Sequence, residues 1–148
     1  MAASPESCTV SFSGPGSQPV YATPGAAGAD VKAHIGDPIL IDPMTHAAIG
    51  TGLFPEIPPG YQIEVRPRSG MALHHAVTVL NAPGTIVSDF RGEIKVILIN
   101  HGPHPFCVRN EDRIAQLVVT PVVRATFQRK EVLSVTERGE DGFGSTGV

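Results

Sequence analysis

Short apolar runs separated by turn residues are the dominant pattern along this chain. They lie at residues 8–12, 29–33, 39–41, 62–66, 76–80, 94–100 and 113–121. Runs of this length, bounded by Gly, Pro, Asn and Asp, are typical of β-strands. The 14 prolines and 16 glycines are spread over all 148 residues, which disfavours long helices. The pattern therefore predicts a single all-β domain, built as a sandwich or barrel.

One short helix interrupts this pattern. It is predicted to start near Ser69 and to run through residues 71–74, with Ser69 placed to cap its first turn. Upstream, Pro55, Pro58 and Pro59 break the middle of the chain into loop or edge structure. Downstream, residues 81–84 read Asn-Ala-Pro-Gly and predict a β-hairpin turn, where splayed strand ends could expose unpaired backbone groups.

Composition excludes several classes of function. The net charge is only −3 and the basic residues are dispersed, so there is no broad basic face for nucleic acid. No apolar stretch is long enough to cross a bilayer, and no charged and apolar leader opens the chain, so a soluble intracellular protein without a membrane partner is expected. Cys8 and Cys107 are interpreted as ordinary thiols, and the six histidines lack the spacing of a metal site.

Two segments carry candidate chemistry. Arg68, Ser69 and Gly70 combine a cation, a hydroxyl and free helix-end donors, which suits an anion, although a plain structural cap has the same residues. Residues 138–148 are rich in glycine and include Arg138 and Phe143, so they could close over a ligand that has phosphates and a flat ring. A polar terminus without a partner is the alternative.

Five segments together resemble the trimeric dUTPases, which hydrolyse dUTP to dUMP and pyrophosphate. They lie at residues 27–31, 66–72, 84–92, 112–117 and 138–147. Each is weak alone, but their order and spacing match over nearly the whole chain from Val20 onward. The resemblance implies a jelly-roll-like β-barrel of residues 1–136, assembled as a homotrimer. Residues 137–148 would form an arm that closes on the active site of a neighbouring subunit.

The resemblance also implies a role for each matching residue. Asp30 helps to hold Mg²⁺ through water. The triphosphate is bound by Arg68, Ser69, Gly70 and Gln116. Uracil is read by backbone and amide contacts at Asn81, Gly84 and Thr85. The ring of Phe90 packs on the deoxyribose and excludes a 2′-hydroxyl, in a place where the family usually has Tyr. The arm covers uracil and phosphates with Arg138, Phe143, Gly144, Ser145 and Thr146.

One component of the family site is missing. The water-activating aspartate of the family lies three residues before the sugar-stacking ring, and that position is Val87 here. Valine can neither orient nor deprotonate water. Asp89 is a possible weak substitute, but on an extended strand it would sit roughly 6 to 7 Å away along the same face. The arm departs as well, since Asp141 stands where the family usually has glycine.

Three functions remain open from the sequence. The first is a dUTPase with poor or absent catalysis, whether Val87 arose naturally or by engineering. The second is a non-catalytic protein of the same fold that binds dUTP or signals through it. The third is deamination of dCTP, a sister activity on this fold, which fits less well because the arm and sugar motifs follow the dUTPase pattern.

Overall fold

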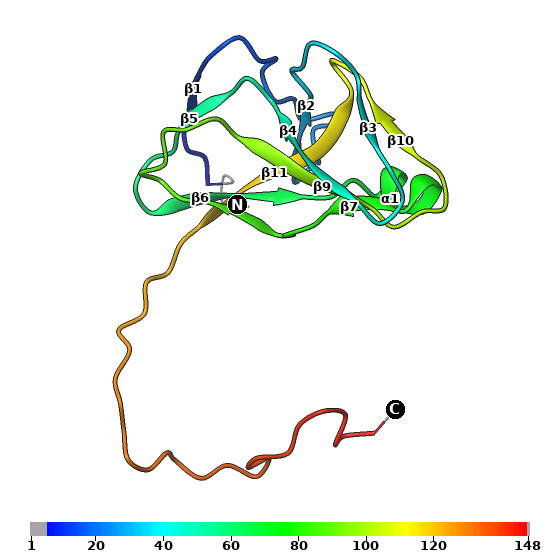
Figure 1. The fold of residues 1–148 in the computed structure, drawn as a ribbon. Helices are drawn as coiled ribbons and strands as arrows, with labels where there is room; N and C mark the ends of the chain where they lie inside the picture. The colour runs from blue at the N-terminus through cyan, green and yellow to red at the C-terminus, as the bar shows by residue number, and fades with distance from the viewer. Residues whose placement is uncertain (1–5, 148) are drawn as a thin grey trace.

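Eleven strands and one short helix make up residues 6–147, the part of the chain that the computed structural model describes (Figure 1). The bounds are β1 Ser11–Ser13, β2 Ala29–Lys32, β3 Ile39–Ile41, β4 His46–Gly50, β5 Phe54–Glu56, β6 Tyr61–Arg66, α1 Ser69–His75, β7 Val77–Val79, β8 Gly84–Ile86, β9 Lys95–Asn100, β10 Phe106–Val108 and β11 Arg113–Pro121. The predicted all-β class is therefore confirmed, and the single helix lies where the sequence placed it.

The strands form two main sheets and two smaller pairs, all antiparallel. The larger sheet has the order β2-β11-β6-β8 and the smaller one β4-β9-β7, while β1 pairs with β5 and β10 with β3. These layers wrap around one apolar core (Figure 1). In β6, Ile63 and Val65 are buried and alternate with polar residues, as expected for a strand with one face inward.

β11 holds the larger sheet together because it pairs with β2 on one edge and β6 on the other. Gln116 lies opposite both Asp30 and Arg66, so these three residues form one row across the sheet. A β-bulge interrupts the pairing between Arg113 and Ala115. Bulges bend a strand and re-aim the side chains beside them. The row and the bulge together fix the polar groups at this end of the barrel.

Two predictions about turns were wrong. Ser69 is the first helical residue and the N-cap is Arg68, which makes no side-chain capping hydrogen bond. Residues 81–84 are not the turn of a hairpin either, because β7 before them pairs with β9 and β8 after them pairs with β6. The turn, in which the Ala82–Pro83 peptide bond is cis, instead carries the chain from one sheet to the other.

Strands β4, β5 and β10 were not predicted, and β8 was expected only as the second strand of a hairpin with β7. β4 has the sequence His-Ala-Ala-Ile-Gly, and only Ile49 in it is fully buried, so it lacks a strong apolar signal. β5 contains Pro55 and pairs with β1 alone, which agrees with the expected loop or edge structure around the prolines.

Beyond Pro121 the chain leaves the barrel as an extended tail, orange to red in Figure 1. Val122 N donates a hydrogen bond to Gly60 O at 2.9 Å, and the residues that follow are exposed. The boundary expected between the barrel (residues 1–136) and the arm (residues 137–148) thus falls inside this tail. Residues 1–5 of the barrel and residue 148 of the arm lie outside the described residues. Within residues 6–147, the helical structure is too short to span a membrane.

Asn100 generates a prediction about stability. Its side chain is fully buried, donates to Ile41 O at 2.9 Å and His104 O at 2.7 Å, and accepts from Gly102 N at 2.9 Å. Asn100→Ala leaves these three groups without their partner, so we expect the free energy of unfolding to fall by about 2–4 kcal/mol in urea denaturation. Asn110→Ala is the matched control, since it removes one exposed bond to Ile35 N and should cost under about 1 kcal/mol. Equal losses in the two variants would contradict this.

Candidate active site

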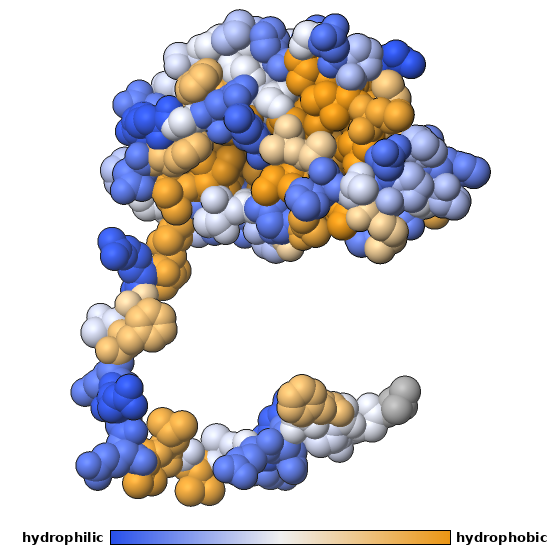
Figure 2. Space-filling model, viewed as in Figure 1, coloured by the Kyte–Doolittle hydropathy of each residue, from blue (hydrophilic) through white to orange (hydrophobic). Residues whose placement is uncertain are grey.

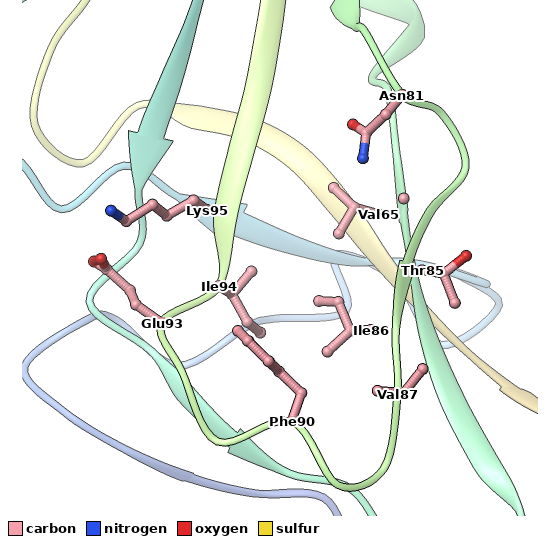
Figure 3. A pocket seen from close by; sticks show the side chains of 10 residues that line it. Val65, Asn81, Thr85, Ile86, Val87, Phe90, Glu93, Ile94 and Lys95 are labelled. Carbon is pink, nitrogen blue, oxygen red and sulfur yellow. The ribbon is translucent and has the colours of Figure 1, made fainter.

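A pocket of about 260 Å³ lies between β8 and β9 (Figure 3). The chain runs from β8 to β9 through residues 87–94, but the two strands belong to different sheets and do not pair. The lining residues are Val65, Asn81, Gly84, Thr85, Ile86, Val87, Phe90, Glu93, Ile94 and Lys95. Figure 3 shows Ile86, Phe90 and Ile94 facing one another, whereas the side chain of Thr85 points away from them. The pocket therefore has apolar walls and a few polar groups at its edges.

Backbone groups of β9 are open at this pocket. β7 pairs with β9 only from Leu98 onward, and Leu80 N adds one bond to Ile97 O at 2.9 Å. Along an antiparallel strand, every second residue turns its N–H and C=O to the same edge. Lys95 therefore presents its backbone groups on the edge that β7 leaves free. Splayed strands with unpaired backbone groups were predicted here, although as part of a hairpin at residues 81–84.

Phe90 rests on a glycine. A Cβ atom at Gly92 would lie 2.7 Å from Phe90 Cζ, so only glycine lets the ring take this position. Val87 precedes it in a tight turn closed by Phe90 N donating to Val87 O at 3.2 Å. The extended strand assumed for Val87 and Asp89 is therefore wrong. Val87 itself is half exposed at the pocket, so an aliphatic side chain stands where the resemblance led us to expect a carboxylate.

Glu93 fixes the beginning of β9 from outside the strand. Its Oε1 accepts a hydrogen bond from Gly52 N at 3.2 Å, and a Cβ at Gly50 would come within 2.9 Å of the same oxygen. This contact joins the wall of the pocket to the connection between β4 and β5. The sequence analysis missed Glu93, and the stretch of small residues at 50–52 was the only signal for it.

Arg68, Ser69 and Gly70 lie at the start of α1. The first backbone bond of the helix runs from Ala72 N to Arg68 O at 3.1 Å, so the N–H groups of Ser69 and Gly70 precede the hydrogen-bonded part of the turn. Both residues are exposed. The geometry gives an oxyanion two backbone donors and a hydroxyl next to a guanidinium group.

Asp30 faces two arginines on the neighbouring elements. Arg68 Nε lies 3.5 Å from Asp30 Oδ1, and Arg113 Nη1 lies 3.7 Å from Asp30 Oδ2. Arg68 also donates from Nη1 to the backbone oxygen of Arg113 at 3.2 Å. The carboxylate is four-fifths buried, so both ion pairs are screened less than fully exposed ones. The structure thus brings together the predicted site residues Asp30 and Arg68. Arg113, to which the sequence analysis assigned no role, contacts both.

Gln116 fastens the loop that leads into Arg68. Its Nε2 donates to Pro67 O at 3.0 Å, and a Cβ at Gly28 would lie only 2.3 Å from its Oε1. Gly28 therefore leaves the space in which the amide of Gln116 lies. The predicted triphosphate residues are adjacent in space, although Gln116 comes from β11 and the others from the start of α1.

The arm residues are not near this pocket in their own chain. Phe143 is fully exposed, and the tail that carries it extends away from the barrel (Figure 1). The tail nevertheless has local structure, since Arg138 Nε and Asp141 O are 2.9 Å apart and Ser145 N donates to Gly142 O at 3.1 Å. Positive φ values at Phe143 (51°) and Gly144 (83°) bend the chain between these turns. Arg138, Phe143, Gly144, Ser145 and Thr146 therefore lie together, apart from the barrel.

Asp30 could hold Mg²⁺ only together with ligands from outside the protein, such as waters and substrate phosphates. Among the described residues, no group of three or more His, Cys, Asp or Glu side chains is placed to hold a metal. Mg²⁺ commonly keeps several waters and is held by one or two carboxylates together with substrate phosphates. A single carboxylate beside an anion-binding loop suits that arrangement, so the donor set agrees with a metal that arrives with a phosphate ligand.

These features define a β-barrel with an apolar-walled pocket between β8 and β9 and a separate cluster of donors at the start of α1. A sequence profile of the family described as dUTPase matches residues 15–147. The deoxyuridine 5'-triphosphate nucleotidohydrolase of Chlamydia pneumoniae is 57% identical over 134 residues, covering 90% of this chain and 92% of that protein. The protein of the same name from Treponema denticola is 53% identical over 130 residues, covering 88% of this chain and 90% of its own length. The chain belongs to the dUTPase family.

Solved structures agree in fold. The dUTPase of Staphylococcus bacteriophage 80alpha with dUpNHpp superposes with a TM-score of 0.86 at 23% identity, over 96% of this chain and 100% of that one. A mutant dUTPase from phage phi11 of S. aureus, described as coordinating a structural Mg(II) ion, gives a TM-score of 0.75 at 18% identity, over 86% of this chain and 100% of that one. The jelly-roll-like barrel implied by the resemblance is thereby confirmed.

Gly28 generates a prediction. Gly28→Ala would push Gln116 away from Pro67, and overpacking of this kind costs about 1–3 kcal/mol. We expect a lower midpoint of thermal unfolding, by roughly 3 °C or more, in a calorimetric scan. Gly36→Ala is the matched control because its added Cβ meets nothing within 4 Å. The packing explanation for Gly28 would fail if both alanines left the midpoint unchanged.

Proposed function

We propose that this chain binds dUTP, and that the reaction of its family, hydrolysis to dUMP and pyrophosphate, is slowed in it by Val87. The observation that carries the proposal is the apolar-walled pocket between β8 and β9, in a member of the dUTPase family whose Arg68, Ser69 and Gly70 offer donors to an anion. The pocket would take the deoxyuridine and the loop the triphosphate.

The pocket suits a small planar base. Apolar side chains can sandwich the ring, while the open backbone of Lys95 and the amide of Asn81 offer donors and acceptors at its edge. Gly84 leaves room for the Asn81 amide at the edge of the pocket, since a Cβ there would lie 3.3 Å from its nitrogen and 3.2 Å from Val65 Cβ. The ring of Phe90, held on Gly92, would pack against the deoxyribose.

Phosphates would extend from there toward α1. The guanidinium of Arg68, the hydroxyl of Ser69 and the backbone N–H of Gly70 are the donors on offer, and Gln116 keeps the loop in place. Asp30 would hold Mg²⁺ through water. When bound, this ion would neutralise charge on the triphosphate and hold the phosphates in one geometry.

The assembly we propose is a homotrimer in which each tail closes the pocket of a neighbour. Apolar side chains line the tail without any cover from their own barrel, as Figure 2 shows: they are Val123, Phe127, Val132, Leu133 and Val135. A soluble protein rarely leaves such a series bare. A second copy of the chain would bury them. The tail would then bring Arg138 and Phe143 to the pocket of a neighbouring barrel, because it does not reach the pocket of its own barrel.

Val87 would affect the chemistry and leave the binding groups intact. Attack of water on a phosphorus atom needs a group that orients the water and takes its proton. An isopropyl side chain accepts no hydrogen bond, and Asp89 lies in the turn that follows. Nucleotide would therefore bind with its ring and phosphates positioned, while the attacking water would lack its base.

A non-catalytic dUTP-binding or signalling protein is the second candidate, favoured by the same observation at Val87. Apart from Phe90 in place of Tyr and Asp141 in place of glycine, the other residues that the resemblance implies remain in the chain. The two candidates differ in whether the chain hydrolyses dUTP at all. A measurement of the rate of dUTP hydrolysis decides between them.

The proposed role of Val87 gives a kinetic prediction. Val87→Asp should release pyrophosphate from dUTP with Mg²⁺ about 10²–10⁴ times faster than the unchanged chain, because a positioned base contributes about that factor. Val87→Asn is the matched control, since the side chain of asparagine has nearly the same shape as that of aspartate but cannot take the proton. This variant should release pyrophosphate as slowly as the unchanged chain. Comparable fast release by all three proteins would show that another residue activates the water.

The second prediction concerns the tail. Trypsin should cut after Arg124, Arg129, Lys130 and Arg138 in the free protein, all of which are exposed. With dUpNHpp and Mg²⁺, a closed arm should slow the cut after Arg138 roughly fivefold or more, as followed by mass spectrometry. ATP serves as the control ligand and should give no protection. Equal cutting with dUpNHpp and ATP would contradict closure of the arm.

A further inference from the structure

Arg113 is the strongest unexplained feature next to the proposed site. Its side chain lies 3.7 Å from Asp30 Oδ2, while its backbone oxygen accepts a hydrogen bond from Arg68 Nη1 at 3.2 Å. Arg68 in turn lies 3.5 Å from Asp30 Oδ1. The three residues form a closed ring of contacts that draws on β2, β11 and the loop before α1.

The β-bulge in β11 places Arg113 in this ring. Arg113 lies opposite Lys32, but the next paired residue, Ala115, lies opposite Val31, so Ile114 is an extra residue between them. In a regular strand, Arg113 and Gln116 would point to opposite faces because they are three residues apart. With the extra residue at Ile114, both turn toward the row that contains Asp30.

We propose that Arg113 is a positioning residue for the triphosphate, acting through Asp30 so that Arg68 stays free to bind phosphate. The inference rests on the proposed function and deepens it. A triphosphate draws Arg68 away from Asp30, which would leave a four-fifths buried carboxylate without a cation. Leaving a buried charge uncompensated is costly. Arg113 remains on Asp30 and offsets that cost.

A direct phosphate contact is the competing explanation. Arg68 and Arg113 both line a hollow of about 380 Å³, whose lining also includes the acidic residues Glu111 and Asp112. A phosphate in this hollow could meet both guanidinium groups. The two explanations differ in one respect, because only the indirect role depends on the charge of Asp30.

A double-mutant cycle separates them. Calorimetric titration with dUpNHpp is run on the unchanged chain, Arg113→Gln, Asp30→Asn and the double variant. EDTA is present throughout, so that metal binding by Asp30 does not enter, at about 0.15 M salt to screen distant charges. Deoxyuridine, which has no phosphate, is titrated into the same four proteins. Arg109→Gln controls for the loss of one positive charge, since Arg109 is exposed in the loop just before β11.

We expect Arg113→Gln to weaken dUpNHpp binding about tenfold in the chain with Asp30 and less than about twofold in the Asp30→Asn background. Arg113→Lys should recover part of the loss, and deoxyuridine affinity should be unchanged in all variants. Arg109→Gln should change dUpNHpp binding less than about twofold.

Three results would overturn the inference: equal losses in both backgrounds, which indicate a direct phosphate contact; a matching loss for deoxyuridine, which indicates a disturbed fold; or no loss at all. Failure of the unchanged chain to bind dUpNHpp with Mg²⁺ present would instead overturn the proposed function itself, and the inference with it.

Discussion

The register of β11 is the constraint on which the arrangement of Asp30, Arg68 and Gln116 depends. One strand pairs with β2 and β6 together, so a shift by one residue would turn Gln116 away from Asp30 and Arg66 at once. The hydrophobic pattern resists such a shift, because Leu117 and the residues around it fill the core. The positions of the polar groups are therefore set by the apolar ones, with a local adjustment at the bulge that contains Ile114.

The sequence predicted the strands whose inward positions carry large aliphatic side chains, such as β6 and β9, because burial alternates along them. It did not predict β4, where alanine and glycine leave Ile49 to carry the signal alone. It also placed the cap of α1 one residue late and joined β7 to β8 as a hairpin. Those errors concern sheet membership and backbone direction, which depend on distant partners that no local pattern contains.

The candidate residues divided in the same way. Asp30, Arg68 and Gln116 lie far apart in the sequence, and their proximity followed from the family resemblance rather than from spacing. Arg113 and Glu93 were missed because their contacts reach across the barrel, to Asp30 and to Gly52. Backbone spaces such as the one at Gly28 can be recognised only when the opposite side chain is known.

In the proposed site, Val87 would separate nucleotide binding from nucleotide hydrolysis, which both depend on the same pocket. The tail divides the proposed site between subunits. Because it covers no part of its own barrel, a completed site in the proposed assembly is the joint product of two copies of the chain. In a cell with two alleles, a defect in the barrel of one and a defect in the tail of the other could compensate for each other in mixed assemblies. Inheritance of such defects would then follow the arrangement of subunits rather than the dose of either allele.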